Sequence, residues 1–184
     1  MPQVKRAVFT LRTELFPTMH REITNKIVLS YTGHVPDNRV DAQFVEYTDC
    51  TKGYFGCSFH YVITTEGIIE VGRDPRTRSS RTRMRRMHKS AIFIGVVGGL
   101  APDTGYRTNT ITPEQDVSVE WLVQELADTL GESLELTDYI ETWGDSRSLT
   151  SPNAGKARDT EFLSILYANM DDTELAATTD RVTI

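Results

Sequence analysis

Short apolar runs rich in β-branched residues alternate with turn-forming residues in the first half of the chain. Residues 26–31 (KIVLSY) form one such run, and the turn formers Thr-Gly-His-Val-Pro-Asp-Asn follow it directly. Residues 91–99 (AIFIGVVGG) form a longer apolar run, as expected for a strand in the middle of a sheet that is covered on both faces. The pattern therefore predicts buried strands near residues 27–31 and 91–97.

The segment SFHYVITTEGIIEVGRD between these runs has the pattern of a β-hairpin. Two β-rich stretches flank Thr65-Glu66-Gly67, and a glycine at this point can adopt the positive φ that a tight turn requires. We expect antiparallel strands near residues 59–64 and 68–72.

Two later patterns predict helices. Apolar residues between Val40 and Tyr47 recur at roughly helical spacing, and Gly53 supplies a stop, which predicts a helix of about ten residues. Thr112 begins the sequence Thr-Pro-Glu-Gln, which combines an N-cap, a proline at the first helical position and a capping-box glutamine. A helix is therefore expected over residues 113–130.

These elements predict an α/β protein with a mixed central β-sheet flanked by helices. A further helix is expected over residues 160–170, where apolar residues share one helical face. The length of 184 residues fits one folded unit. We expect a domain of residues 26–170, an N-terminal extension of residues 1–25 and a C-terminal tail of residues 171–184.

The composition indicates a soluble protein from a reducing compartment. No apolar run approaches the roughly 18 to 20 residues of a membrane span, and the first residues contain no apolar signal-peptide centre. The two cysteines, Cys50 and Cys57, are expected to be free thiols rather than a disulfide. We therefore expect no contact with a membrane.

Positive charge is concentrated in one segment of an otherwise acidic chain. The formal net charge is −6, yet residues 73–89 contain seven arginines and one lysine against the single acid Asp74. Such a block is either a binding patch or a solvated loop, and both interpretations stay open. No specific nucleic-acid partner is expected. The candidate binding residues are Arg76, Arg78, Arg81, Arg83, Arg85, Arg86 and Lys89.

Four segments, taken in order, resemble the type 2 N-acetylmuramoyl-L-alanine amidases, a family that includes the peptidoglycan recognition proteins and the small phage amidases called lysozymes. The phage branch is the more similar. The resemblance implies an α/β amidase fold and a zinc ion held by two histidines and a cysteine, with one position open for water. The segments are KIVLSYTG, FHYVITTEGIIEVGRD, AIFIGVVGG and ITPEQ.

The positions that the resemblance assigns to the zinc ligands carry other residues here. They match Ser30, Trp143 and Ser151, and neither a neutral serine hydroxyl nor an indole is a good zinc ligand. Two supporting positions, with acid–base and oxyanion roles in the phage enzymes, match Leu149 and Phe59. We therefore expect no metal, no cofactor and no catalytic residues.

One site histidine of the family, at His60, is retained. It is interpreted as a hydrogen-bonded histidine rather than as a ligand. A rebuilt metal site would need other donors, and their spacing is not typical of zinc sites, although His34 could approach His60 from its loop. Cys57 and His60, three residues apart on an expected strand, should point to opposite faces. The remaining donors are His20, His88 and Cys50.

Three functions stay open. The first is a catalytically inactive amidase-fold protein that acts as a structural or protein-interaction component of a bacteriophage particle. The second is inhibition of phage RNA polymerase, as some phage amidases of this family do. The third is peptidoglycan binding or active amidase chemistry. We expect other protein chains as partners, contacts through residues 73–89 or 171–184, and a location in the virion or the host cytoplasm.

Overall fold

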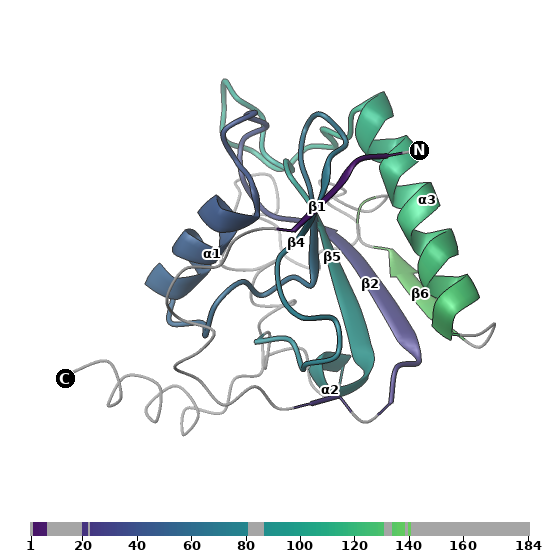
Figure 1. Cartoon of the computed structure of the whole chain (residues 1–184). Helices are drawn as coiled ribbons and strands as arrows, with labels where there is room; N and C mark the ends of the chain where they lie inside the picture. Colours follow the sequence, from purple (N-terminus) through teal and green to yellow (C-terminus); the bar gives the residue numbers. More distant parts are fainter. Residues whose placement is uncertain are drawn as a thin grey trace, which may run out of the picture.

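The structure is a computed structural model, and it describes residues 2–6, 20, 21, 23–80, 87–130, 134–138 and 140. In this part of the chain a six-stranded sheet lies between two long helices (Figure 1). The elements are β1 (Val4–Arg6), β2 (Lys26–Tyr31), α1 (Ala42–Thr51), β3 (Tyr61–Ile63), β4 (Ile69–Val71), α2 (Met87–Ser90), β5 (Ala91–Val96), α3 (Pro113–Leu130) and β6 (Glu135–Asp138).

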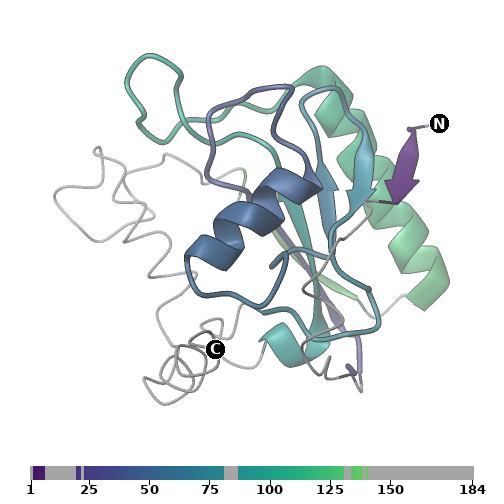
Figure 2. The same cartoon turned by 60° about the vertical axis from the view of Figure 1, so that its left-hand side comes forward.

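The sheet is mixed, with strand order β1-β4-β3-β5-β2-β6. Strands β3 and β4 form an antiparallel hairpin, and the other neighbouring pairs are parallel. Helix α1 covers one face and α3 the other, as the two views in Figures 1 and 2 show together. The predicted α/β architecture with a mixed central sheet is confirmed.

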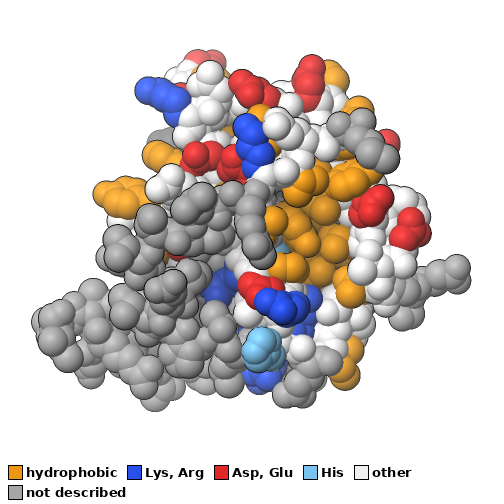
Figure 3. Space-filling view, in the orientation of Figure 1, with side chains coloured by type: hydrophobic (Ala, Val, Ile, Leu, Met, Phe, Trp, Pro, Cys, Tyr) orange, Lys and Arg blue, Asp and Glu red, His pale blue; other side chains and the backbone are white. Residues whose placement is uncertain are grey.

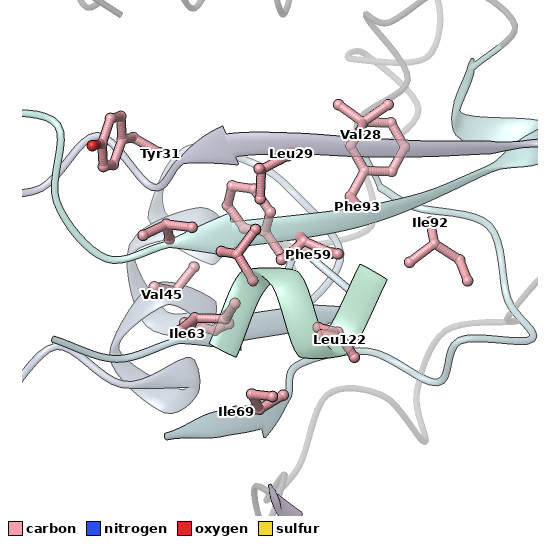
Figure 4. Close-up of a cluster of buried hydrophobic side chains, with 14 of the residues drawn as sticks. Val28, Leu29, Tyr31, Val45, Phe59, Ile63, Ile69, Ile92, Phe93 and Leu122 are labelled. Atoms are coloured by element: carbon pink, nitrogen blue, oxygen red, sulfur yellow. The ribbon is translucent and has the colours of Figure 1, made fainter. Parts of the chain in front are cut away.

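The hydrophobic core fills both sides of the central strands. All six residues of β5 are buried, and so are five of the six residues of β2. This explains why these two segments read as continuous apolar runs instead of alternating ones. Leu122 of α3 lies on the same side of the sheet as Ile63 and Ile69 (Figure 4).

The N-terminus of α3 is fixed by the predicted capping box. The Thr112 hydroxyl accepts a hydrogen bond from the Gln115 amide N–H at 3.1 Å, and the Gln115 side-chain oxygen accepts one from the Thr112 N–H at 3.0 Å. The side-chain amide of Gln115, which is fully buried, also donates to the Val97 carbonyl at 2.8 Å. Gln115 therefore joins the helix start to the end of β5.

The hairpin turn packs directly on the same helix start. Gly67 has φ of 75°, and a Cβ atom at this position would lie 2.5 Å from the Glu114 carbonyl oxygen. The Ser118 hydroxyl donates to the Gly67 carbonyl at 2.6 Å. Only glycine satisfies both the backbone conformation and the close approach.

Several elements differ from the prediction. Strand β1 lies within the expected N-terminal extension, and β6 was not predicted. The hairpin strands are shorter than expected, because the ladder between β3 and β5 begins only after His60. The helix expected over residues 160–170 lies outside the described residues, as does the tail 171–184. No helix in the described part is long and apolar enough to cross a membrane.

Candidate functional site

Ser30 lies near the carboxyl end of β2 and faces α1. It is the register partner of Gly95, and the same row across β3 reaches Glu70 in β4. The Glu70 carboxylate accepts a hydrogen bond at 2.8 Å from the N–H of Ala42, the first residue of α1. The side chains of this row therefore lie on the face of the sheet that α1 covers. The position that resembles a zinc-ligand position is therefore covered on the α1 side.

Two hydroxyls on this face are buried without a hydrogen-bond partner among the described residues. Ser30 is 1% exposed and Thr32 is 5% exposed, and neither side-chain oxygen has a partner in this part of the chain. They lie two residues apart along one strand direction and therefore point to the same side. Buried hydroxyls normally have a partner, so this pair is a candidate contact point for a bound polar group.

Phe59 packs beside Ser30. A Cβ atom at Gly95 would lie 2.8 Å from two ring carbons of Phe59, so the ring lies directly on the sheet at this glycine. Because Gly95 and Ser30 are register partners, the ring and the hydroxyl share one face. Phe59 is 1% exposed and contributes packing at one of the two positions to which the resemblance assigns acid–base and oxyanion roles.

His60 is held by two hydrogen bonds to the main chain. Its Nδ1 accepts a bond from the Phe93 N–H at 2.8 Å, so Nε2 carries the hydrogen and donates to the Thr77 carbonyl at 3.0 Å. Burial lowers the pKa of His60 to about 3, although the bond to Thr77 opposes the shift. Both nitrogens are engaged and the ring is neutral, so His60 in this arrangement offers no lone pair to a metal.

The other thiols and imidazoles do not assemble around His60. His34 lies 3.4 Å from the Thr48 hydroxyl and packs edge-on against Phe44, both on α1, rather than approaching His60. Burial raises the pKa of the Cys57 thiol far above its usual range and keeps it protonated. The expectation that Cys57 and His60 point to opposite faces assumed that both lie in a strand. Strand β3 begins only at Tyr61, so neither residue lies in it.

These donors do not fit the zinc site of the family. All four histidines and both cysteines of the chain lie within the described residues. In that part of the chain, no three His, Cys, Asp or Glu side chains are grouped so that they could hold a metal ion. The residues outside it contain no histidine or cysteine, so they cannot supply the imidazole or thiolate ligands of that site. Trp143, Leu149 and Ser151 are among the residues that the structure does not describe.

Arg73 has a structural role that the sequence did not reveal. Its side chain is buried and donates from Nε to the Cys57 carbonyl at 2.8 Å and from Nη2 to the Phe55 carbonyl. Buried Asp49 of α1 accepts from the Ser58 N–H at 2.8 Å. Burial lowers the pKa of Arg73. The arginine and the aspartate together fix the loop that carries Phe59 and His60, although in sequence Arg73 is only one of the arginines of the basic block.

The other described basic residues of this segment differ in exposure. Arg76 has a side chain that is 78% exposed and forms a bidentate pair with Asp74, and this hydrogen bonding lowers the pKa of Asp74 to about 2. Lys89 is exposed and Arg78 is half-buried. Arg81, Arg83, Arg85 and Arg86 lie outside the described residues.

The geometry described above is that of the type 2 amidase and peptidoglycan recognition protein fold. The chain is similar to the N-acetylmuramoyl-L-alanine amidase LysC from Clostridium intestinale URNW, with a TM-score of 0.60 and 20% identity over 90% of this chain and 98% of that one. It is similar to the peptidoglycan recognition protein ectodomain complex LCa–LCx bound to tracheal cytotoxin, with a TM-score of 0.57 and 11% identity over 88% and 94%.

The fold also matches the Ph2119 endolysin from the Thermus scotoductus MAT2119 bacteriophage Ph2119. The TM-score is 0.54 and the identity 15%, over 76% of this chain and 90% of that one. No protein-family profile matches the sequence. No curated protein matches it at a significant level. The resemblance that the four sequence segments carry is thus confirmed at the level of the fold.

Proposed function

We propose that this chain is a non-hydrolytic protein of the amidase fold that binds peptidoglycan fragments on the α1 face of its sheet. The observation that carries the proposal is Ser30, a neutral, buried hydroxyl at the position where the resemblance places a zinc ligand. A catalytic zinc site takes three protein ligands and one open position. Ser30, with Trp143 and Ser151, leaves all three ligand positions without imidazole or thiolate.

The environment of the site supports binding rather than hydrolysis. Phe59 brings a packed aromatic ring to one of the two positions that have acid–base and oxyanion roles in the phage enzymes, and His60 is a neutral hydrogen-bonded residue. The hydroxyls of Ser30 and Thr32 have no hydrogen-bond partner among the described residues, which leaves hydrogen-bonding capacity on this face. The similar structures support the ligand class, because they include amidases and a recognition-protein complex with bound tracheal cytotoxin.

Hydrolysis is tested on the purified full-length chain incubated with Zn²⁺. We expect no stoichiometric zinc by elemental analysis and no cleavage of the muramoyl–alanine bond. The variant with Ser30→His, Trp143→His and Ser151→Cys together is the matched gain-of-ligand control and should retain more zinc. One zinc per wild-type chain together with cleavage would overturn the non-hydrolytic assignment.

Ligand binding is tested by calorimetric titration with a purified disaccharide–tetrapeptide muropeptide. We expect saturable binding that Ser30→Ala weakens, while the unfolding midpoint stays the same because no described protein partner is lost. Ser118→Ala is the matched control, since that hydroxyl is also buried but belongs to α3, on the other face of the sheet, and bonds to the Gly67 carbonyl. Absence of saturable binding by the wild type would remove the peptidoglycan assignment.

A structural role in a bacteriophage particle is the second candidate. The exposed side chains of Arg76 and Lys89, in the basic segment of residues 73–89, favour it because they can contact an acidic protein neighbour. The variant with Arg81, Arg83, Arg85 and Arg86 changed to serine and a truncation after Met170 test the two expected contact regions. Association like that of the wild type in both variants would refute this role. Inhibition of phage RNA polymerase stays a prediction from the resemblance.

A further inference from the structure

The solvent side of α1 is aromatic and uncharged. Both carboxylate side chains of the helix, those of Glu46 and Asp49, are buried, whereas the rings of Phe44 and Tyr47 are 41% and 68% exposed. This distribution is the reverse of the usual one, in which a helix turns its charged residues to water and its aromatic residues to the core. Figure 3 shows hydrophobic side chains at the left edge of the molecule, where α1 lies in Figure 1. Packing of the core does not explain these exposed rings.

Neutral polar side chains accompany the two rings along the helix. Gln43, Tyr47 and Thr51 are spaced four residues apart and are all exposed, so they form one row along α1. Phe44 lies three residues before Tyr47, which makes the two rings neighbours on this surface. All exposed residues of α1 are therefore uncharged. We call these four residues the outer α1 surface.

The outer α1 surface adjoins the candidate site at the end of β2. The bridge between His34 and Gly99 continues the pairing of β2 with β5 beyond Thr32. Alternate residues of an extended segment point to the same side, so the His34 side chain follows that of Thr32 toward α1. The His34 ring packs edge-on against the Phe44 ring, with 5.6 Å between the ring centroids. A ligand bound at Ser30 and Thr32 can therefore extend past His34 to the exposed ring of Phe44.

A sugar ring is the ligand whose chemistry matches this surface. The face of a pyranose presents C–H groups, which are attracted to the negative face of an aromatic ring, and its hydroxyl and acetamido groups can bond to neutral side chains such as Gln43 and Thr51. The carboxylates of a peptide stem would instead select cationic side chains, and α1 itself contains none. We propose that Phe44 and Tyr47 form a stacking subsite for the uncharged glycan part of a peptidoglycan fragment, an inference that rests on the function proposed at Ser30.

The subsite is tested on the full-length chain by calorimetric titration with a glycan and with a muropeptide. The glycan is the tetramer of N-acetylglucosamine, which is neutral and carries no peptide, and the muropeptide is the disaccharide–tetrapeptide. We expect saturable binding of both. Tyr47→Ala should weaken each by about fivefold or more, because one stacked ring is lost. Tyr47→Phe keeps the ring and should bind both like the wild type.

Two controls separate the subsite from other effects. Val117→Ala should change neither titration, because Val117 is 61% exposed on α3, on the other face of the sheet. Ser30→Ala should weaken binding of the muropeptide and leave binding of the glycan tetramer unchanged. Circular dichroism checks that each variant is folded.

The two titrations also distinguish failure of the subsite from failure of the proposed function. The subsite is refuted if the wild type does not bind the tetramer, or if Tyr47→Ala and Phe44→Ala bind it like the wild type, even where the muropeptide still binds. Tetramer binding that depends on Tyr47, without any binding of the muropeptide, would support the glycan subsite and refute the function proposed at Ser30.

Discussion

Acidification should destabilise the protein through His60 well before the carboxylates of Asp37 and Asp74 protonate. The imidazole has an ordinary pKa of 6.5, and burial lowers it to about 3 in the folded chain. Between these two values the unfolded chain binds a proton that the folded chain does not. Stability is therefore fully present above pH 6.5 and falls as the pH decreases through this window.

The size of this loss of stability follows from the difference between the pKa values of His60 in the unfolded and folded chain. Each pH unit between the two pKa values costs about 1.4 kcal/mol for one proton, so going from pH 6.5 to pH 5 costs about 2 kcal/mol. The carboxylates of Asp37 and Asp74, whose pKa values are lowered to about 2, stay ionised over this range. The loss between pH 7 and pH 5 is therefore attributed mainly to histidine.

Urea unfolding at pH 7 and pH 5 measures this loss in the wild type and in His60→Gln. Glutamine offers one acceptor and one donor for the Phe93 N–H and the Thr77 carbonyl but does not titrate. The other three histidines are present in both proteins, so the difference between the two pH dependences belongs to His60. A difference below about 0.5 kcal/mol would show that the folded chain accommodates a charged imidazole at this position.

Two further substitutions test the contacts at the start of α3 by denaturant unfolding. Gly67→Ala should destabilise the fold by roughly 2 to 4 kcal/mol, because the left-handed backbone disfavours alanine and the alanine Cβ would meet the Glu114 carbonyl. A loss of stability below about 0.5 kcal/mol would contradict this. Gln115→Ala should destabilise the fold by about 2 to 3 kcal/mol, because the buried Val97 carbonyl loses its donor. The control Gln124→Ala, at an exposed position of the same helix, should change stability by less than about 0.5 kcal/mol. Equal effects of the two substitutions would contradict this reasoning.

The elements that the sequence predicted are those with a strong local signal. The strands β2 and β5 follow from uninterrupted apolar runs, and α3 from the capping sequence at Thr112. Strand β1 has only three residues, of which Val4 and Lys5 are exposed, and it is defined by its main-chain pairing with β4, which no local pattern encodes. Strand β6 is short and polar, with Leu136 48% exposed. Both edge strands depend on partners far away in sequence.

In the candidate site, too, the sequence predicted some features and not others. The identity of Ser30 and Phe59 at positions of chemical importance was accessible through the resemblance to the amidases. Their surroundings were not, because the contact of Phe59 with Gly95 joins residues 36 positions apart and depends on the sheet register. The burial of Arg73 likewise depends on its contact with the loop before β3. In the sequence, Arg73 could therefore not be distinguished from the other arginines of the basic block.

His60 illustrates why a family-like residue need not indicate family chemistry. Its two nitrogens satisfy a strand N–H at Phe93 and a turn carbonyl at Thr77, and these bonds do not depend on any metal. Buried main-chain groups require such partners whether or not the protein is an enzyme. The fold therefore gives a reason for this histidine in the absence of catalysis. Ser30 has no partner of this kind among the described residues, so no hydrogen bond in this part of the chain explains its residue type. The contrast between the two residues is the structural reason for proposing binding rather than hydrolysis.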